Sequence, residues 1–175
     1  MAEPFSSLGN VLGGSDILPD CRVAFEKWHA CVSKMMVGGA DPNNPETERA
    51  FQEFVRDHVH EEVLLDPPTY NGTYTGKLPF RVILSTVGQV FGPSFTYHRQ
   101  WLSNDGREWA LEFTTSIADT GKQIRGIDLV SLDAEGKIVS FRILAAPPSG
   151  VSALRDEMFS RVPKAMEKMV ASSSL

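Results

Sequence analysis

Alternating apolar and polar positions mark the second half of the chain, most clearly over Gly126–Ala145, GIDLVSLDAEGKIVSFRILA. This period of two predicts two strands joined by a turn at Ala134-Glu135-Gly136. Before the turn, one strand face is predicted to carry Ile124, Gly126, Asp128, Val130 and Leu132. After the turn, one face is predicted to carry Ile138, Ser140, Arg142 and Leu144, and the other Val139, Phe141, Ile143 and Ala145. The hairpin therefore places one carboxylate, Asp128, on an otherwise apolar face.

Two further strands are predicted before this hairpin, over Phe95–Ser103 and Glu108–Ala118. The tripeptide Asn104-Asp105-Gly106 between them is a strong hairpin signal, and Thr120-Gly121 turns the chain into the next strand. Strict alternation in the first strand would place on one face Phe95, Tyr97, Arg99 and Trp101. The second half of the chain is thus expected to form a four-stranded antiparallel meander.

The first half of the chain shows apolar residues three and four positions apart, the spacing of amphipathic helices. Helices are predicted over about Leu18–Val37, from Pro45 onward with Asn44 as the N-cap, and over about Leu78–Phe91. A short strand, Val63–Asp66, lies among these helices. It is expected to end at Pro67-Pro68, because proline has no backbone donor for a sheet.

The chain divides into three parts on this basis. Residues 1–15 are small, polar and glycine-rich and are expected to be loose, whereas residues 16–150 form one domain. Residues 151–175 are a C-terminal helix and tail, with the helix expected from Ser152 to about Val170 and interrupted near Pro163. The predicted fold class is α+β, with three N-terminal helices packed on a curved antiparallel sheet and a C-terminal helix after it.

Asp128 is the residue whose position most needs an explanation. Burying an isolated carboxylate costs several kcal/mol unless it is paired, hydrogen-bonded or protonated. Three interpretations remain open: Asp128 lies on a hydrated face, it is bound to a partner, or it is a functional acid with a raised pKa.

Composition and charge exclude several classes of function. The 175 residues carry a net charge of -5 without a basic cluster, which argues against nucleic acid, and no apolar run reaches the roughly 18 residues of a membrane span. Cys21 and Cys31 would lie about 15 Å apart in one helix, too far for a disulfide. Neither these thiols nor His58 and His60, which would point to different sides of a helix, form a metal site. A reduced, cytoplasmic protein without metal or cofactor is expected.

The order of elements over about residues 18–148 resembles the cystatin-like cone of the nuclear transport factor 2-like (NTF2-like) and SnoaL-like superfamily. This group includes polyketide cyclases, limonene epoxide hydrolase, scytalone dehydratase and ketosteroid isomerase. The most specific match is Gly126-Ile127-Asp128 with Gly136–Arg142, which resembles the last hairpin of ketosteroid isomerase. The pair Asp66-Pro67 similarly resembles the Asp-Pro pair that ends that family's first strand.

This resemblance implies roles for particular residues. Asp128 would be the neutral acid that donates a hydrogen bond to a developing oxyanion, and Asp66 would be the general base. The resemblance implies that Phe141, Ile143 and Ala145 line the pocket. Further candidates to bind substrate are Trp28, Tyr70, His98, Trp101 and Phe113. Trp101 has a second interpretation as part of a dimer interface.

Two departures from the family pattern limit the resemblance. The first predicted helix contains no tyrosine, so either another group, such as His98, Tyr97 or Tyr70, completes an oxyanion hole, or the chain has none. Epoxide hydrolysis needs a second aspartate beside Arg142, where the chain instead has Ile143 and Leu144, so this chemistry is disfavoured.

The implied function is a cofactor-independent proton-transfer enzyme: an isomerase, cyclase or dehydratase. Its substrate would be a small, mostly apolar carbonyl compound, such as a steroid-like or polyketide-like ring. The alternative is a non-catalytic module of the same fold that binds a small molecule or dimerises. The expected partners are a small apolar ligand and a second copy bound through the sheet face, with neither nucleic acid nor membrane.

Overall fold

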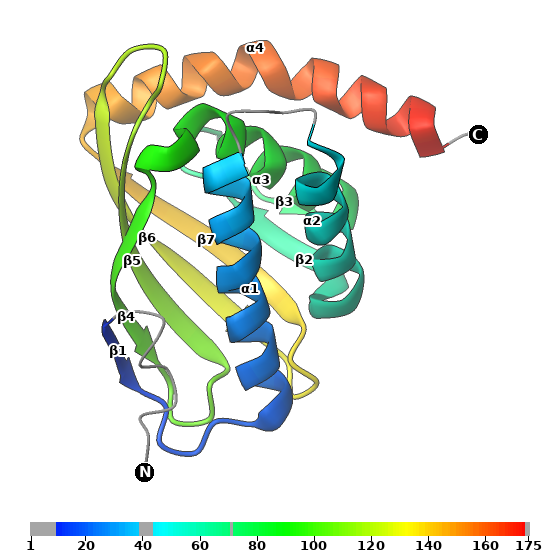
Figure 1. The fold of residues 1–175 in the computed structure, drawn as a ribbon, viewed down its shortest axis with the longest axis vertical. Coiled ribbons are helices and arrows are strands. Elements are labelled where there is room, and N and C mark those ends of the chain that lie inside the picture. The colour runs from blue at the N-terminus through cyan, green and yellow to red at the C-terminus, as the bar shows by residue number, and fades with distance from the viewer. Residues whose placement is uncertain (1–9, 39–43, 71, 174–175) are drawn as a thin grey trace.

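The computed structural model of the protein describes residues 10–38, 44–70 and 72–173, and Figure 1 shows its fold. The elements in chain order are β1 (Asn10–Gly13), α1 (Pro19–Gly38), α2 (Pro45–His58), β2 (Val59–Asp66), β3 (Tyr74–Thr75), α3 (Lys77–Phe91), the 3₁₀ helix η1 (Gly92–Ser94), β4 (Thr96–Leu102), β5 (Glu108–Ser116), β6 (Gln123–Leu132), β7 (Ile138–Ala146) and α4 (Pro148–Ser173). A mixed α+β fold with a curved sheet is therefore confirmed.

The sheet has seven strands in the order β1-β4-β5-β6-β7-β2-β3. Strands β4 to β7 form the antiparallel meander that the alternating pattern predicts. The sheet as a whole is mixed, however, because β2 runs parallel to β7 and β1 runs parallel to β4. In Figure 1, α1 lies over one face of the sheet, and α4 crosses the end of the molecule opposite to the β6–β7 turn.

The ends of the helices agree with the sequence signals in one case and differ in another. At the start of α2 the Glu46 backbone N–H donates to the Asn44 side chain over 3.0 Å, which is the predicted N-cap. The interruption predicted at Pro163 is wrong, because α4 continues through this residue and starts earlier, at Pro148. A proline removes one backbone hydrogen bond but keeps a helical φ, so the turns on either side still form.

Three segments contain more strand than the sequence pattern indicated. Residues 10–13, expected to be loose, form β1 beside β4, whereas residues 1–9 lie outside the described part. Strand β2 begins at Val59, so His60 lies in a strand and His58 ends the helix. Tyr74–Thr75, inside a predicted loop, pairs with β2.

Irregular pairing changes two of the predicted strand faces. The register between β4 and β5 shifts between Tyr97 and Gln100, so Gln100 is fully buried and Arg99 is exposed. Tyr97 therefore does not share a face with Arg99 as strict alternation required. A similar shift at the end of β6 brings Ile138 into the core with Phe141.

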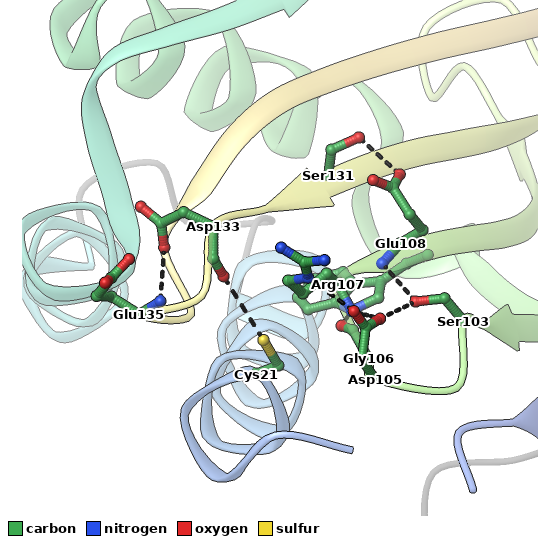
Figure 2. A network of polar contacts seen from close by, with 10 residues as sticks. Cys21, Ser103, Asp105, Gly106, Arg107, Glu108, Ser131, Asp133 and Glu135 are labelled. Atoms are coloured by element: carbon green, nitrogen blue, oxygen red, sulfur yellow. Dashed lines mark hydrogen bonds and ion pairs between the residues drawn. The ribbon is translucent and has the colours of Figure 1, made fainter. Parts of the chain in front are cut away.

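A polar network fixes the two hairpin turns beside the first turn of α1 (Figure 2). Arg107 Nε and Ser103 Oγ each donate to Asp105 over 2.7 Å, and these hydrogen bonds lower the pKa of Asp105 to about 2. The Leu18 backbone N–H donates to the Asp105 carbonyl over 3.0 Å, and Cys21 Sγ donates to the Asp133 carbonyl over 3.8 Å. The start of α1 is thereby held against the sheet.

In the described residues, no helix is both long and apolar enough to span a membrane.

Candidate functional site

An apolar cavity of about 60 Å³ lies between the inner face of the sheet and helices α1, α3 and α4. Five of the residues predicted to bind substrate line it: Trp28, Phe113, Phe141, Ile143 and Ala145. The titratable side chains on its lining are Asp128 and Tyr97. Apart from Thr69 and the Trp28 indole N–H, the rest of the lining is apolar, so these two side chains are the groups on it that can exchange a proton.

The pairing of β6 explains why Asp128 faces inward. Asp128 lies opposite Leu111 of β5 and Ile143 of β7, and only 6% of its surface is exposed. Tyr97 Oη donates to Asp128 Oδ2 over 2.6 Å, and Trp28 Nε1 donates to Tyr97 Oη over 3.2 Å. Of the three candidates for the missing tyrosine of the first helix, Tyr97 is thus the one that contacts Asp128.

Burial controls the charge of this pair. Removal from water raises the pKa of Asp128 to about 7, although the hydrogen bond from Tyr97 favours the carboxylate. Burial and the neighbouring Asp128 charge raise the pKa of Tyr97 well above its usual value. Near neutral pH, Asp128 therefore exchanges a proton readily while Tyr97 stays protonated.

One oxygen of Asp128 remains available to a ligand. Within the described part of the chain, the side chain that is hydrogen-bonded to Asp128 is Tyr97, and it contacts the Oδ2 atom of Asp128. In the same residues, every fully buried side-chain polar atom has a hydrogen-bond partner. Oδ1 is not contacted by Tyr97, so it is not fully buried and keeps some accessible surface. Because Asp128 lines the cavity, its second oxygen is placed to exchange a proton with a molecule inside.

Asp66 lies on the other face of the sheet. Its pairing partner on β7 is Arg142, which in turn pairs with Leu129 of β6, and Arg142 and Leu129 are both exposed. Arg142 Nε donates to Asp66 Oδ2 over 2.8 Å. The next residue, Pro67, lines the cavity instead. The preceding strand residue, Leu65, is fully buried, so Asp66 points to the opposite face, and the structure does not bring Asp66 and Asp128 together.

Three more residues predicted to bind substrate lie away from the cavity lining. Tyr70 packs against Phe159 of α4, with ring centroids 5.0 Å apart. His98 is exposed and its Nε2 is hydrogen-bonded to Thr114 Oγ1 at 2.7 Å. Trp101 lies under the Arg99 guanidinium, 5.3 Å from the ring centroid, in the wall of a hollow on the outer sheet face.

Sequence reasoning missed the walls that α3 and α4 contribute. Leu84 and Val87 of α3 and Leu154 and Met158 of α4 all line the cavity. The four-residue spacing of Leu154 and Met158 is a signal of one buried helix face, but it does not indicate what that face covers. Within the described residues, no group of three or more His, Cys, Asp or Glu side chains is placed to hold a metal ion.

A second polar pair, the half-buried His29 and the fully buried Gln100, lies beside Tyr97. His29 of α1 is hydrogen-bonded through Nε2 to Gln100 and through Nδ1 to the Phe25 carbonyl oxygen, the latter at 2.9 Å. Its ring lies 5.5 Å from that of Tyr97, measured between centroids. Burial lowers the pKa of His29, and the two hydrogen bonds oppose this effect. His29 is therefore neutral in the folded protein at neutral pH.

We expect His29 to weaken the folded state in mild acid. In the unfolded chain its pKa is about 6.5, so as the pH falls below this value the unfolded state binds the proton first. The contribution of His29 to the free energy of unfolding should fall between pH 7 and pH 5. The stability of the wild type relative to His29→Gln should therefore be lower at pH 5 than at pH 7, and the Asp128 contribution, which is common to both proteins, cancels in this comparison. Urea denaturation at both pH values measures the difference, and a difference that does not change with pH would exclude His29 as the source.

No protein-family model and no curated protein matches the chain. A steroid delta-isomerase structure from Pseudomonas aeruginosa is 26% identical, covering 89% of this chain and 94% of that chain, with a TM-score of 0.62. An uncharacterised bacterial protein with a cystatin-like fold, from Silicibacter pomeroyi, is 32% identical over 78% of this chain and 88% of its own, with a TM-score of 0.58.

A more distant structure agrees with these two in fold. A SnoaL-like polyketide cyclase structure from Jannaschia sp. is 10% identical over 74% of this chain and 92% of that chain, with a TM-score of 0.52. At this identity the likeness concerns the fold alone. The identity and coverage of the first two structures, together with the curved sheet, show that the chain belongs to the NTF2-like/SnoaL-like superfamily.

Proposed function

We propose that the protein is a cofactor-independent proton-transfer enzyme whose substrate is a small, mostly apolar carbonyl compound. The observation that supports this proposal is Asp128, a buried carboxyl group with a pKa of about 7 that lines an apolar cavity. A group that transfers protons works best when its pKa lies near the working pH. The resemblance of this hairpin to ketosteroid isomerase, and the 26% identity with a steroid delta-isomerase structure, support the same class of reaction.

In the proposed reaction, the Asp128 carboxylate removes a proton from the carbon next to the carbonyl group. The resulting carboxylic acid returns a proton to the same or a conjugated carbon, so atoms and charge balance without a cofactor. Tyr97 holds Oδ2 by its 2.6 Å hydrogen bond and leaves Oδ1 toward the cavity. Tyr97 is therefore a positioning residue in this scheme, and one carboxyl group serves as both base and acid.

Hydrogen exchange on 2-cyclohexenone tests this proposal. In D₂O, the wild-type protein should speed deuterium incorporation next to the carbonyl, as followed by NMR. Asp128→Asn keeps the shape of the side chain but cannot move the proton, so the acceleration should be lost. If a series of cyclic ketones and enones exchanges equally slowly with and without wild-type protein, the proposed enzymatic function is contradicted.

The Asp66→Asn variant distinguishes the role of Asp66 from that of Asp128. Since Asp66 is bonded to Arg142 away from the cavity lining, we expect this variant to exchange 2-cyclohexenone at the wild-type rate. A loss comparable to that of Asp128→Asn would restore Asp66 as the general base. Circular dichroism of both variants establishes that the comparison is between folded proteins.

A non-catalytic ligand-binding module is the second candidate. It is favoured by the absence of a second carboxylate among the described residues that line the cavity. The cavity measures about 60 Å³, whereas ligand pockets usually measure about 300–1,000 Å³, so both candidate functions require a wall to move. For a binding module, 2-cyclohexenone would bind to wild type and to Asp128→Asn without any faster exchange in either.

We also propose a homodimer formed through the outer face of the sheet. That face exposes Leu129 and Leu144 to 37% and 55%, next to the hollow that contains Trp101. Leu144→Glu should shift the protein to the monomer in analytical ultracentrifugation, because it places a charge inside the interface. Leu78→Glu, at an exposed position on α3, is the matched control and should not change the molecular mass.

A further inference from the structure

Helix α4 closes the cavity with two side chains one turn apart. Leu154 and Met158 are 3% and 2% exposed, and both lie on the cavity lining. They approach it from the helix that crosses one end of the molecule (Figure 1). A molecule inside the cavity would therefore contact α4 as well as the sheet.

The cavity as it stands does not hold a ring. Its volume is about 60 Å³, whereas a cavity that binds benzene measures about 150 Å³. A substrate with a six-membered ring, as in the proposed function, requires one of the walls to move. The question is which wall is attached least firmly.

Three of the walls are held to other elements by hydrogen bonds. The sheet wall consists of the paired strands β5, β6 and β7. Helix α1 is joined to β4 through Trp28–Tyr97 and through His29–Gln100, both partly buried.

Helix α3, the third of these walls, is attached at two points. Arg81 donates to Glu48 of α2 over 2.7 Å in a partly buried contact, and the Val90 carbonyl accepts from the Ala118 backbone N–H over 3.3 Å. Moving the sheet, α1 or α3 would break these hydrogen bonds.

Helix α4 is held differently. Over residues 148–168, its side-chain hydrogen bond to the rest of the described chain is Arg161 to Asp119, 2.9 Å long and exposed. Exposed ion pairs of this kind contribute little. Over the same residues, 148–168, the remaining attachment is apolar packing, including Phe159 on Tyr70 and the pair Leu154 and Met158. Apolar packing is non-directional, so a ligand that fills the same space can replace it.

We propose that the Leu154–Met158 turn of α4 is the movable wall of the cavity and that Met158 sets the largest ligand admitted. The inference rests on the proposed function only in that the cavity takes a ligand. A methionine suits this role because its unbranched, flexible side chain can adopt several shapes. The class of ligand is a single six-membered ring with one oxygen for Asp128, and fused two-ring compounds are resisted by Met158.

Binding of phenol and 2-naphthol, measured by isothermal titration calorimetry, tests the size limit. Met158→Ala should add on the order of 100 Å³ to the cavity. It should therefore bind 2-naphthol at least about tenfold more tightly than wild type, a gain of about 1.4 kcal/mol. Met158→Leu keeps the volume, and Arg155→Ala changes an exposed position on the same helix, so both should bind as wild type does. Equal affinities in Met158→Ala and wild type would overturn the proposal.

Amide hydrogen exchange tests the movement itself. With phenol bound, the wild type should exchange faster around Leu154 than without it, because the turn is displaced. Met158→Ala should show no such increase, since its enlarged cavity holds a single ring without displacement. Unchanged exchange in the wild type with bound phenol would contradict the movable wall. If Met158→Ala does not fold, Leu154→Val trims the same wall by less and should change the affinity in the same direction.

These results are independent of the proton-transfer chemistry. Tighter 2-naphthol binding in Met158→Ala, together with no loss of 2-cyclohexenone exchange in Asp128→Asn, would support the wall and contradict the proposed function. If 2-cyclohexenone exchange depends on Asp128 but 2-naphthol affinity is the same in Met158→Ala and wild type, the results would support the proposed function and contradict the movable wall.

Discussion

Asp128→Asn is expected to stabilise the protein at pH 8 and to have little effect near pH 4. The folded state keeps Asp128 protonated up to about pH 7, whereas the unfolded chain ionises it near pH 3.8. Stability associated with this residue is therefore complete below pH 3.8 and is lost as the pH rises through 7. A rise in pKa from 3.8 to about 7 corresponds to about 4 kcal/mol. The asparagine has no such cost at high pH, so the gain in free energy of unfolding should approach this value at pH 8.

Urea denaturation of wild type and variant at several pH values between 4 and 8 measures this gain. The contribution of His29 is common to both proteins and cancels in the difference. Tyr97→Phe provides a matched variant of opposite effect, because it removes the hydrogen bond that favours the Asp128 carboxylate. Its stability should fall more steeply than that of wild type as the pH rises. Parallel curves for wild type and Asp128→Asn would mean that the carboxyl group ionises freely in the folded protein.

The location of Asp128 was predictable from the sequence because it depends on simple alternation. Between Gln123 and Leu132 the strand pairs regularly with β5, so the apolar face of the pattern is the buried face. Asp66 shows the limit of the same reasoning. A resemblance at Asp66-Pro67 identified the end of the strand, but the pairing of β2 with β7 decides which of the two residues faces inward. A difference of one residue reverses the answer.

The sequence named Tyr97 as one of three candidates to complete the site, but it could not select Tyr97 over His98 and Tyr70. Its orientation depends on the irregular pairing between Tyr97 and Gln100, and a β-bulge leaves little trace in a pattern of apolar and polar residues. The contribution of α4 was hidden for another reason. The apolar spacing of Leu154 and Met158 predicts a buried helix face, but only the packing of α4 against α3, β6 and β7 determines that this face closes the cavity.

Gly126→Ala is expected to destabilise the protein by about 3 kcal/mol, the upper end for a substitution that overpacks a core. Gly126 precedes Asp128 by two residues and lies on the same strand face. A Cβ at this position would lie 2.5 Å from Phe113 Cζ and would also meet the Leu144 carbonyl oxygen. Real Cβ contacts are not this short, so the Phe113 ring and the β7 backbone would both have to shift. The glycine of the Gly-Ile-Asp segment thus allows Phe113 to pack against the backbone beside the cavity.

Gly88→Ala makes the same chemical change with the opposite expected result. A Cβ at Gly88, inside α3, would lie 3.6 Å from Met35 Cβ, an ordinary contact. Alanine in a helix interior is favoured over glycine by about 0.5–1 kcal/mol, so this variant should be slightly more stable than wild type.

Phe113→Leu added to Gly126→Ala should recover only part of the stability that Gly126→Ala loses, because the clash with the Leu144 carbonyl remains. Urea denaturation of the variants measures these differences. A Gly126→Ala protein as stable as wild type would mean that β6 and β7 separate easily, and the wall behind Asp128 would then be as movable as α4.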